Sequence, residues 1–359
     1  MSIREFDVAI HHGRVIDPGS QLDAIRHIGI RGSTIKAVSE TPLAGKMVID
    51  ASGLVVAPGC IDLDSHSQSI PDDYLLAYDG VTTVLGLESG ILPVGLWYDR
   101  QAKSGRALNY GTAVAWIYAR VAELNPELGE PYATLSYLRK AFGVQEWSTL
   151  VATPGQVERM LARIEQGLQE GGIGISVNDE YKSAAGVQEM AAVAALADQY
   201  DVPTFYYRHD QTGTQPCSAG KFARLIARCV QNFEELSLLE AVEKCSLIPA
   251  QILEKITPSM IRKGRLQVGA DADVIVFDLE KVANRTSFER PNIRSIGMRY
   301  VLVNGMQLIS DSELDVMALP GQPVRRAIHP AEWRADPALR RRRRKNDFQL
   351  RRLKFTDYE

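Results

Sequence analysis

Two residues that could bind one metal ion, Asp64 and His66, directly follow an apolar run that ends at Leu63. Side chains at positions i and i+2 of an extended segment point to the same side of the strand. A carboxylate and an imidazole placed together at a strand end could share one cation, and zinc accepts both kinds of ligand. The ordinary alternatives are that Asp64 caps the strand end or a turn, and that His66 packs in the fold or faces solvent.

Three more residues could complete such a site. Glu88, at the end of the next strand-like run, could supply a bridging carboxylate or be an ordinary exposed acid. His209 could be another metal ligand or a loop residue. Asp210 could carry a proton during catalysis or be a polar turn residue. The remaining four of the six histidines lie outside residues 59–261: His11, His12, His27 and His329.

The length and composition are those of a globular protein. At 359 residues the chain can form one large domain or two medium ones. No apolar run approaches the roughly 20 residues that span a bilayer, and residues 1–7 lack the apolar core of a signal peptide. We therefore expect a cytoplasmic protein without a membrane partner. Its four cysteines show no C-x-x-C spacing, which predicts reduced thiols.

Positive charge is concentrated near the C-terminus. The net charge is -3, yet residues 340–345 are six consecutive cations. Such a run could attract a polyanion or an acidic partner subunit. The few apolar residues around it favour the simpler interpretation, a solvated basic tail over residues 326–359, and nucleic-acid binding is not expected.

Both ends of the chain have the pattern of short strands. Residues 1–58 alternate apolar and polar side chains between glycine-containing turns, and the pattern returns over 262–325. Within the second segment, Asn304 and Gly305 separate two alternating runs, which is a strong signal for a β-hairpin. We predict one small β-sandwich domain built from 1–58 and 262–325 together.

The middle segment, 59–261, alternates strand and helix signals. Capping-box patterns begin helices at 153–156 and at 237–240. This alternation predicts an α/β domain with a parallel sheet, open or closed into a barrel. The five expected strands are 54–63, 80–87, 110–117, 172–177 and 202–207. A complete (β/α)8 barrel typically takes about 250 residues, so we predict an incomplete (β/α) barrel whose open edge could support a homo-oligomer.

Several stretches recur in the order and spacing of a known family: GRVIDP at 13–18, VAPGCIDL at 56–63, DGVTT at 79–83, SAGKFAR at 218–224 and KGRLQVGADAD at 263–273. They resemble the D-aminoacylase branch of the amidohydrolase superfamily, above all its N-acyl-D-glutamate deacylase-like members. The likeness covers nearly all of residues 5–325, less a piece missing from the barrel segment, and leaves out the tail.

The resemblance implies a β-sandwich joined to a metal-dependent-hydrolase-type barrel, with one or two zinc ions at the carboxyl ends of its strands. Its chemistry is hydrolysis of an acyl–nitrogen bond in a small amide by metal-activated water. Here Asp64 occupies the place of the first ligand histidine. Tyr207 occupies the place of another, and the nearest imidazole is that of His209.

Two functions follow from the sequence. The first is hydrolysis of a non-peptide carbon–nitrogen bond, such as that of an N-acyl-D-amino acid, with zinc bound by Asp64, His66, Glu88 and His209 and with Asp210 as proton carrier. The second is a catalytically lapsed protein that keeps the amidohydrolase fold as a scaffold or partner subunit. The altered ligand positions favour one zinc ion or none.

Overall fold

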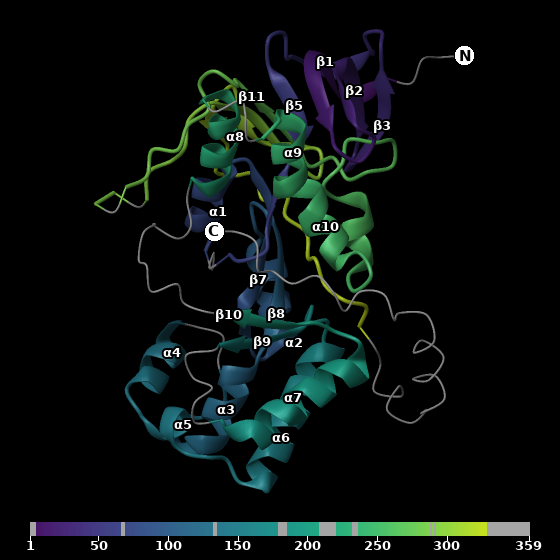
Figure 1. Ribbon diagram of the computed structural model, residues 1–359. Coiled ribbons are helices and arrows are strands. Elements are labelled where there is room, and N and C mark those ends of the chain that lie inside the picture. The colour runs from purple at the N-terminus through teal and green to yellow at the C-terminus, as the bar shows by residue number, and fades with distance from the viewer. Residues whose placement is uncertain are drawn as a thin grey trace, which may run out of the picture.

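The computed structural model describes residues 5–65, 69–131, 135–178, 185–207, 220–231, 236–287, 289–290 and 292–328. Their strands form two sheets, one of nine strands and one of five. Figure 1 shows β1, β2 and β3 of the larger sheet at one end of the molecule and the helices α5 and α6 at the other, with β7 and β8 between them. No helix within these ranges is long and apolar enough to span a membrane.

The nine-stranded sheet draws strands from both ends of the chain. Its order is β14-β13-β12-β11-β5-β1-β2-β3, and β4 pairs with β1. Antiparallel pairing of β11 with β5, in which Val276 lies opposite Val56, joins the two halves. The strands are β1 Phe6–Asp17, β2 Leu22–Arg31, β3 Thr34–Ser39, β4 Gly45–Asp50, β5 Val55–Pro58, β11 Val274–Phe277, β12 Met298–Val303, β13 Met306–Ser310 and β14 Glu313–Leu314.

The predicted hairpin at Asn304 and Gly305 is confirmed. These two residues connect β12 to β13, and their φ angles are 50° and 79°. Two positive φ angles in a two-residue loop are typical of a type I′ turn, whose twist matches that of the flanking strands. A Cβ on Gly305 would lie 2.1 Å from the carbonyl oxygen of Gly32, so this position excludes any larger residue.

The five-stranded sheet is parallel, with the order β10-β9-β8-β7-β6. Each of the five regions predicted as barrel strands overlaps one of its strands, and in the part of the chain that the structure describes no further strand joins them. The strands are β6 Cys60–Asp62, β7 Val81–Ile91, β8 Asn109–Ala115, β9 Ile175–Asn178 and β10 Thr204–Tyr207.

Gly59 divides the first predicted strand, 54–63, between the two sheets. The expectation of one continuous strand was wrong, because β5 belongs to the nine-stranded sheet and β6 to the parallel one. The Gly59 N–H donates to the Asp273 carbonyl at 3.0 Å. A Cβ at this position would lie 2.1 Å from the hydroxyl oxygen of Thr82. The chain therefore changes sheets at a point where only glycine fits.

Helices follow most strands of the parallel sheet. The predicted capping boxes are present at Thr153, which begins α6, and at Ser237, which begins α9. The second predicted helix continues through a π-helical turn (η3, Glu243–Leu247) into α10. The other elements are α1 Ile70–Ala77, α2 Val94–Ser104, α3 Trp116–Leu124, η1 Pro126–Leu128, α4 Leu135–Phe142, α5 Glu146–Thr149, α6 Pro154–Gln169, α7 Gly186–Tyr200, α8 Lys221–Gln231, α9 Leu238–Val242, α10 Ile248–Leu253 and η4 Pro258–Arg262.

Residues 321–326 lie beside β8 of the parallel sheet, although the strands just before them belong to the other sheet. The Tyr110 N–H donates to Gln322 at 3.1 Å, and the Val324 N–H donates to the Tyr110 carbonyl at 2.7 Å. A hydrophobic core that includes Ile275 and Tyr98 also packs the two sheets together. These contacts fix the position of the parallel sheet against the larger one.

Candidate functional site

The carboxyl end of β6 carries Asp64 and brings it beside β7. Asp64 is exposed and forms an isolated bridge with Gly86. On either side of it, the Ser65 N–H donates to Leu85 at 3.1 Å and the Leu87 N–H donates to the Leu63 carbonyl at 3.3 Å. Asp64 therefore lies beside Gly86, two residues before Glu88 in β7.

Glu88 lies late in β7 and is half-buried. Its backbone carbonyl accepts a hydrogen bond from the hydroxyl of Ser176, on β9. Asp64 thus follows the end of β6 and Glu88 lies in the carboxyl-terminal half of β7, while Ser176 is the second residue of β9. In α/β folds with parallel strands, this end of the sheet is where ligands and reaction centres lie.

His66, His209 and Asp210 lie outside the described residues, so their proposed roles remain predictions. For the described residues, the donor set can be compared with zinc chemistry. The carboxylates of Asp64 and Glu88 are suitable oxygen ligands. Within the described ranges, however, no group of three or more His, Cys, Asp or Glu side chains could hold a metal ion. The described part of the site therefore does not by itself form a zinc site.

Three of the other histidines lie together in the nine-stranded sheet. The ring centroids of His11, His12 and His27 are 4.9 to 5.7 Å apart. Burial lowers the pKa of His27 from its ordinary value, and the two neighbouring imidazoles lower it further. This cluster is on β1 and β2, so it contributes nothing to the carboxyl ends of the parallel strands.

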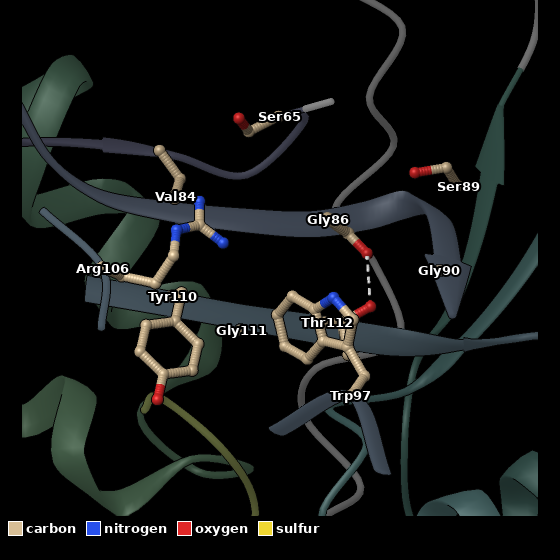
Figure 2. A pocket seen from close by; sticks show the side chains of 10 residues that line it. All are labelled: Ser65, Val84, Gly86, Ser89, Gly90, Trp97, Arg106, Tyr110, Gly111 and Thr112. Atoms are coloured by element: carbon tan, nitrogen blue, oxygen red, sulfur yellow. Dashed lines mark hydrogen bonds between the residues drawn. The ribbon is translucent and has the colours of Figure 1, made fainter. Parts of the chain in front are cut away.

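A small pocket lies against β7 and β8, next to the chain neighbours of both candidate carboxylates (Figure 2). Its volume of about 10 Å³ is room for about one water molecule. The Thr112 hydroxyl donates to the Gly86 carbonyl at 3.4 Å across it. The pocket is lined by Ser65, Val84, Gly86, Ser89, Gly90, Trp97, Arg106, Tyr110, Gly111 and Thr112.

Arg106 is the charged residue of this lining, and no sequence motif pointed to it. Its side chain is 2% exposed and forms a two-point ion pair with Asp73, at 2.7 and 2.5 Å. Gln101 accepts a third hydrogen bond from the guanidinium at 2.9 Å. Because Asp73 compensates this buried charge, the pocket suits water or a small polar group.

Two more buried carboxylates lie where α8 meets the parallel sheet. Asp62 accepts hydrogen bonds from the backbone of Asp64 and from Lys221. Asp79 accepts from the N–H groups of Phe222 and Ala223. Burial raises the pKa of Asp79 to about 6, although these two hydrogen bonds act in the opposite direction. Sequence patterns could not reveal the contacts of Asp62 and Asp79 with α8, because these contacts join residues far apart in the chain.

Comparison with known proteins shows what this chain is similar to. A model of an amidohydrolase family matches residues 208–309. The N-acyl-D-glutamate deacylase of Alcaligenes xylosoxydans xylosoxydans is 41% identical over 86 residues, which are 24% of this chain and 17% of that protein. A dihydroorotase of Streptococcus pyogenes serotype M3 is 40% identical over 88 residues, 22% of this chain and 21% of that one. The chain therefore matches only about a fifth of the length of these curated relatives.

Solved structures share the fold over most of the chain. A D-aminoacylase structure has a TM-score of 0.69 and 17% identity, covering 89% of this chain and 100% of that one. The N-acyl-D-glutamate deacylase of Bordetella bronchiseptica, complexed with zinc and a phosphonate inhibitor, has a TM-score of 0.65 and 18% identity, covering 90% and 100%. In sequence this chain is thus similar to an amidohydrolase family over residues 208–309, and in fold it is similar to D-aminoacylase.

Proposed function

We propose that the protein hydrolyses an acyl–nitrogen bond other than a peptide bond, in a small amide such as an N-acyl-D-amino acid. The observation that carries this proposal is the position of Asp64 and Glu88 at the carboxyl ends of the neighbouring strands β6 and β7. Similarity to an amidohydrolase family supports the reaction class, and the deacylase among the relatives suggests the kind of substrate.

In this proposal Asp64, His66, Glu88 and His209 are the metal ligands, and zinc is the metal. When bound, zinc supplies the polarisation of the scissile carbonyl and lowers the pKa of a water molecule to about 7. The carboxylates of Asp64 and Glu88 contribute negative charge and oxygen donors at the strand ends. Asp210 takes a proton from water and passes it to the leaving nitrogen.

A second candidate function is that of a lapsed amidohydrolase, which keeps the fold as a scaffold or partner subunit. The replacement of two expected ligand histidines by Asp64 and Tyr207 agrees with it.

Metal content and turnover separate the two candidates. The hydrolase requires about one zinc per chain, measured by elemental analysis of the purified protein, and hydrolysis of at least one N-acyl-D-amino acid from a panel, lost on chelation. Less than 0.1 zinc per chain, on the order of contamination, together with no turnover would support the scaffold.

An Asp64→His substitution tests the rest of the site. If the other ligands are intact, the added imidazole should raise zinc affinity about tenfold or more, because it restores a strong nitrogen ligand. The matched control is Asp278→His, which adds an imidazole just after β11 of the nine-stranded sheet, at a residue that is not a proposed ligand. Equal zinc binding by the two variants would contradict a preformed site.

A further inference from the structure

Asp62, the last residue of β6, has a side chain that is 2% exposed and that joins two distant parts of the chain. Its Oδ1 accepts a hydrogen bond from the Asp64 N–H at 3.1 Å and from the Lys221 ammonium at 2.5 Å. Asp62 and Lys221 are 159 residues apart in sequence. One buried carboxylate oxygen thus links the end of β6 to the first residue of α8.

The Asp62–Asp64 contact explains how β6 ends. An Asp side chain that accepts from the backbone N–H two residues later forms an Asx turn, which competes with strand pairing. The neighbouring backbone groups of Ser65 and Leu63 bond to β7 instead. The direction in which Asp64 leaves the strand therefore depends on where the Asp62 carboxylate is held.

The position of α8 does not depend on Lys221 alone. The carboxylate of Asp79 accepts the Phe222 N–H at 3.0 Å and the Ala223 N–H at 2.9 Å. The Ser295 hydroxyl bonds to the same carboxylate at 3.1 Å. A carboxylate is favourable at a helix N-terminus, where unpaired N–H groups and the helix dipole meet it. Asp79 thus anchors the start of α8, and the Lys221 side chain reaches from that anchored start to Asp62.

We propose that Asp62 and Lys221 are positioning residues for Asp64. The Lys221 ammonium compensates the charge of the buried Asp62 carboxylate, and that carboxylate fixes the turn that sets Asp64 beside Gly86. The relevance to catalysis rests on the proposed function, in which Asp64 is a ligand. The backbone effect does not depend on it and can be measured separately.

The test is amide hydrogen exchange in the full chain, resolved at Asp64, Phe222 and Ala223. In Lys221→Met, which keeps the length of the side chain and removes its charge, we expect Asp64 to exchange about tenfold faster than in the wild type. Phe222 and Ala223 should stay within about twofold, because Asp79 still accepts their hydrogen bonds.

Three further variants sharpen the result. Lys221→Arg keeps the charge and should preserve the slow exchange of Asp64. Asp62→Ala removes the acceptor and should reproduce the effect of Lys221→Met. The matched control is Lys46→Met, which breaks an exposed ion pair with Asp7 and should leave Asp64 unchanged.

Unchanged Asp64 exchange in both Lys221→Met and Asp62→Ala overturns the proposal. Equal acceleration at Asp64, Phe222 and Ala223 also overturns it, since that pattern indicates general loosening. If either variant fails to fold, the other still decides. Zinc affinity is a second readout: a wild type that binds zinc should lose about 10- to 100-fold in Lys221→Met. A wild type without zinc contradicts the proposed function and leaves the exchange result valid.

Discussion

Replacing Asp79 by Asn should change the pH dependence of folding stability in a defined direction. The Asp79 side chain is fully buried between β7 and the start of α8. Desolvation by burial raises its pKa from 3.8 to about 6, and hydrogen bonds from Ala223, Phe222 and Ser295 oppose the rise. Asn has the same shape and no titration, so it isolates the protonation of this one group.

The magnitude follows from the difference between the two pKa values of Asp79. A rise of about 2 pKa units at 1.36 kcal/mol per unit is about 3 kcal/mol in total. Between pH 3.8 and about 6 the folded protein binds this proton more readily than the unfolded chain does. Protonation of Asp79 therefore adds its full contribution to the free energy of unfolding below pH 3.8, and this contribution is lost as the pH rises through about 6. Between pH 4.5 and 7 the loss amounts to about 2 kcal/mol.

The Asp79→Asn substitution should therefore lower the free energy of unfolding less at pH 7 than at pH 4.5, and the difference between the two losses should be about 2 kcal/mol. Urea unfolding followed by tryptophan fluorescence at both pH values gives this difference, and titrations of all other groups cancel. Asp278→Asn is the control of opposite sign, because a hydrogen bond from Lys281 lowers the pKa of Asp278. The destabilisation by that variant should shrink as the pH falls. An Asp79→Asn effect that is equal at both pH values, or larger at pH 7, would refute the reasoning.

Two further pairs of substitutions, each a test and its control, probe the packing of the fold. Gly59→Ala should lower the free energy of unfolding by about 1–3 kcal/mol, because the added Cβ would overlap Thr82 of β7. The control is Gly155→Ala in the first turn of α6, where the nearest atom to the added Cβ is 3.7 Å away, so this change should be neutral or stabilising by up to about 1 kcal/mol. Thermal melts compare the two variants. Arg120→Met should cost about 3–5 kcal/mol because it leaves Glu189 buried without its ion-pair partner. Arg14→Met, at an exposed pair, should cost about 0–1 kcal/mol in the same urea assay, and similar costs for both arginines would contradict the role of burial.

Local sequence was sufficient to predict two helix starts, one hairpin and the regions of the parallel strands. The capping boxes at Thr153 and Ser237 and the turn at Asn304 depend on hydrogen bonds and φ angles within a few residues. Strand regions in the middle segment were found for the same reason, since period-2 patterns and turn residues are local. The motif around Asp64 also carried the resemblance to the amidohydrolases, because it is a short run of fixed order.

Which strands pair, and what surrounds the site, was decided by the tertiary structure. The division of 54–63 at Gly59 and the return of residues 321–326 to β8 depend on contacts with distant backbone. The pairs Asp62–Lys221 and Arg106–Asp73 join residues 159 and 33 positions apart. No periodicity connects such partners, because they come together only when burial of the two sheets brings their strands and helices into contact. The sequence by itself thus determined the local turns, helix starts and strand regions and carried the resemblance to a family, and the packing of those elements decided how Asp64 is held.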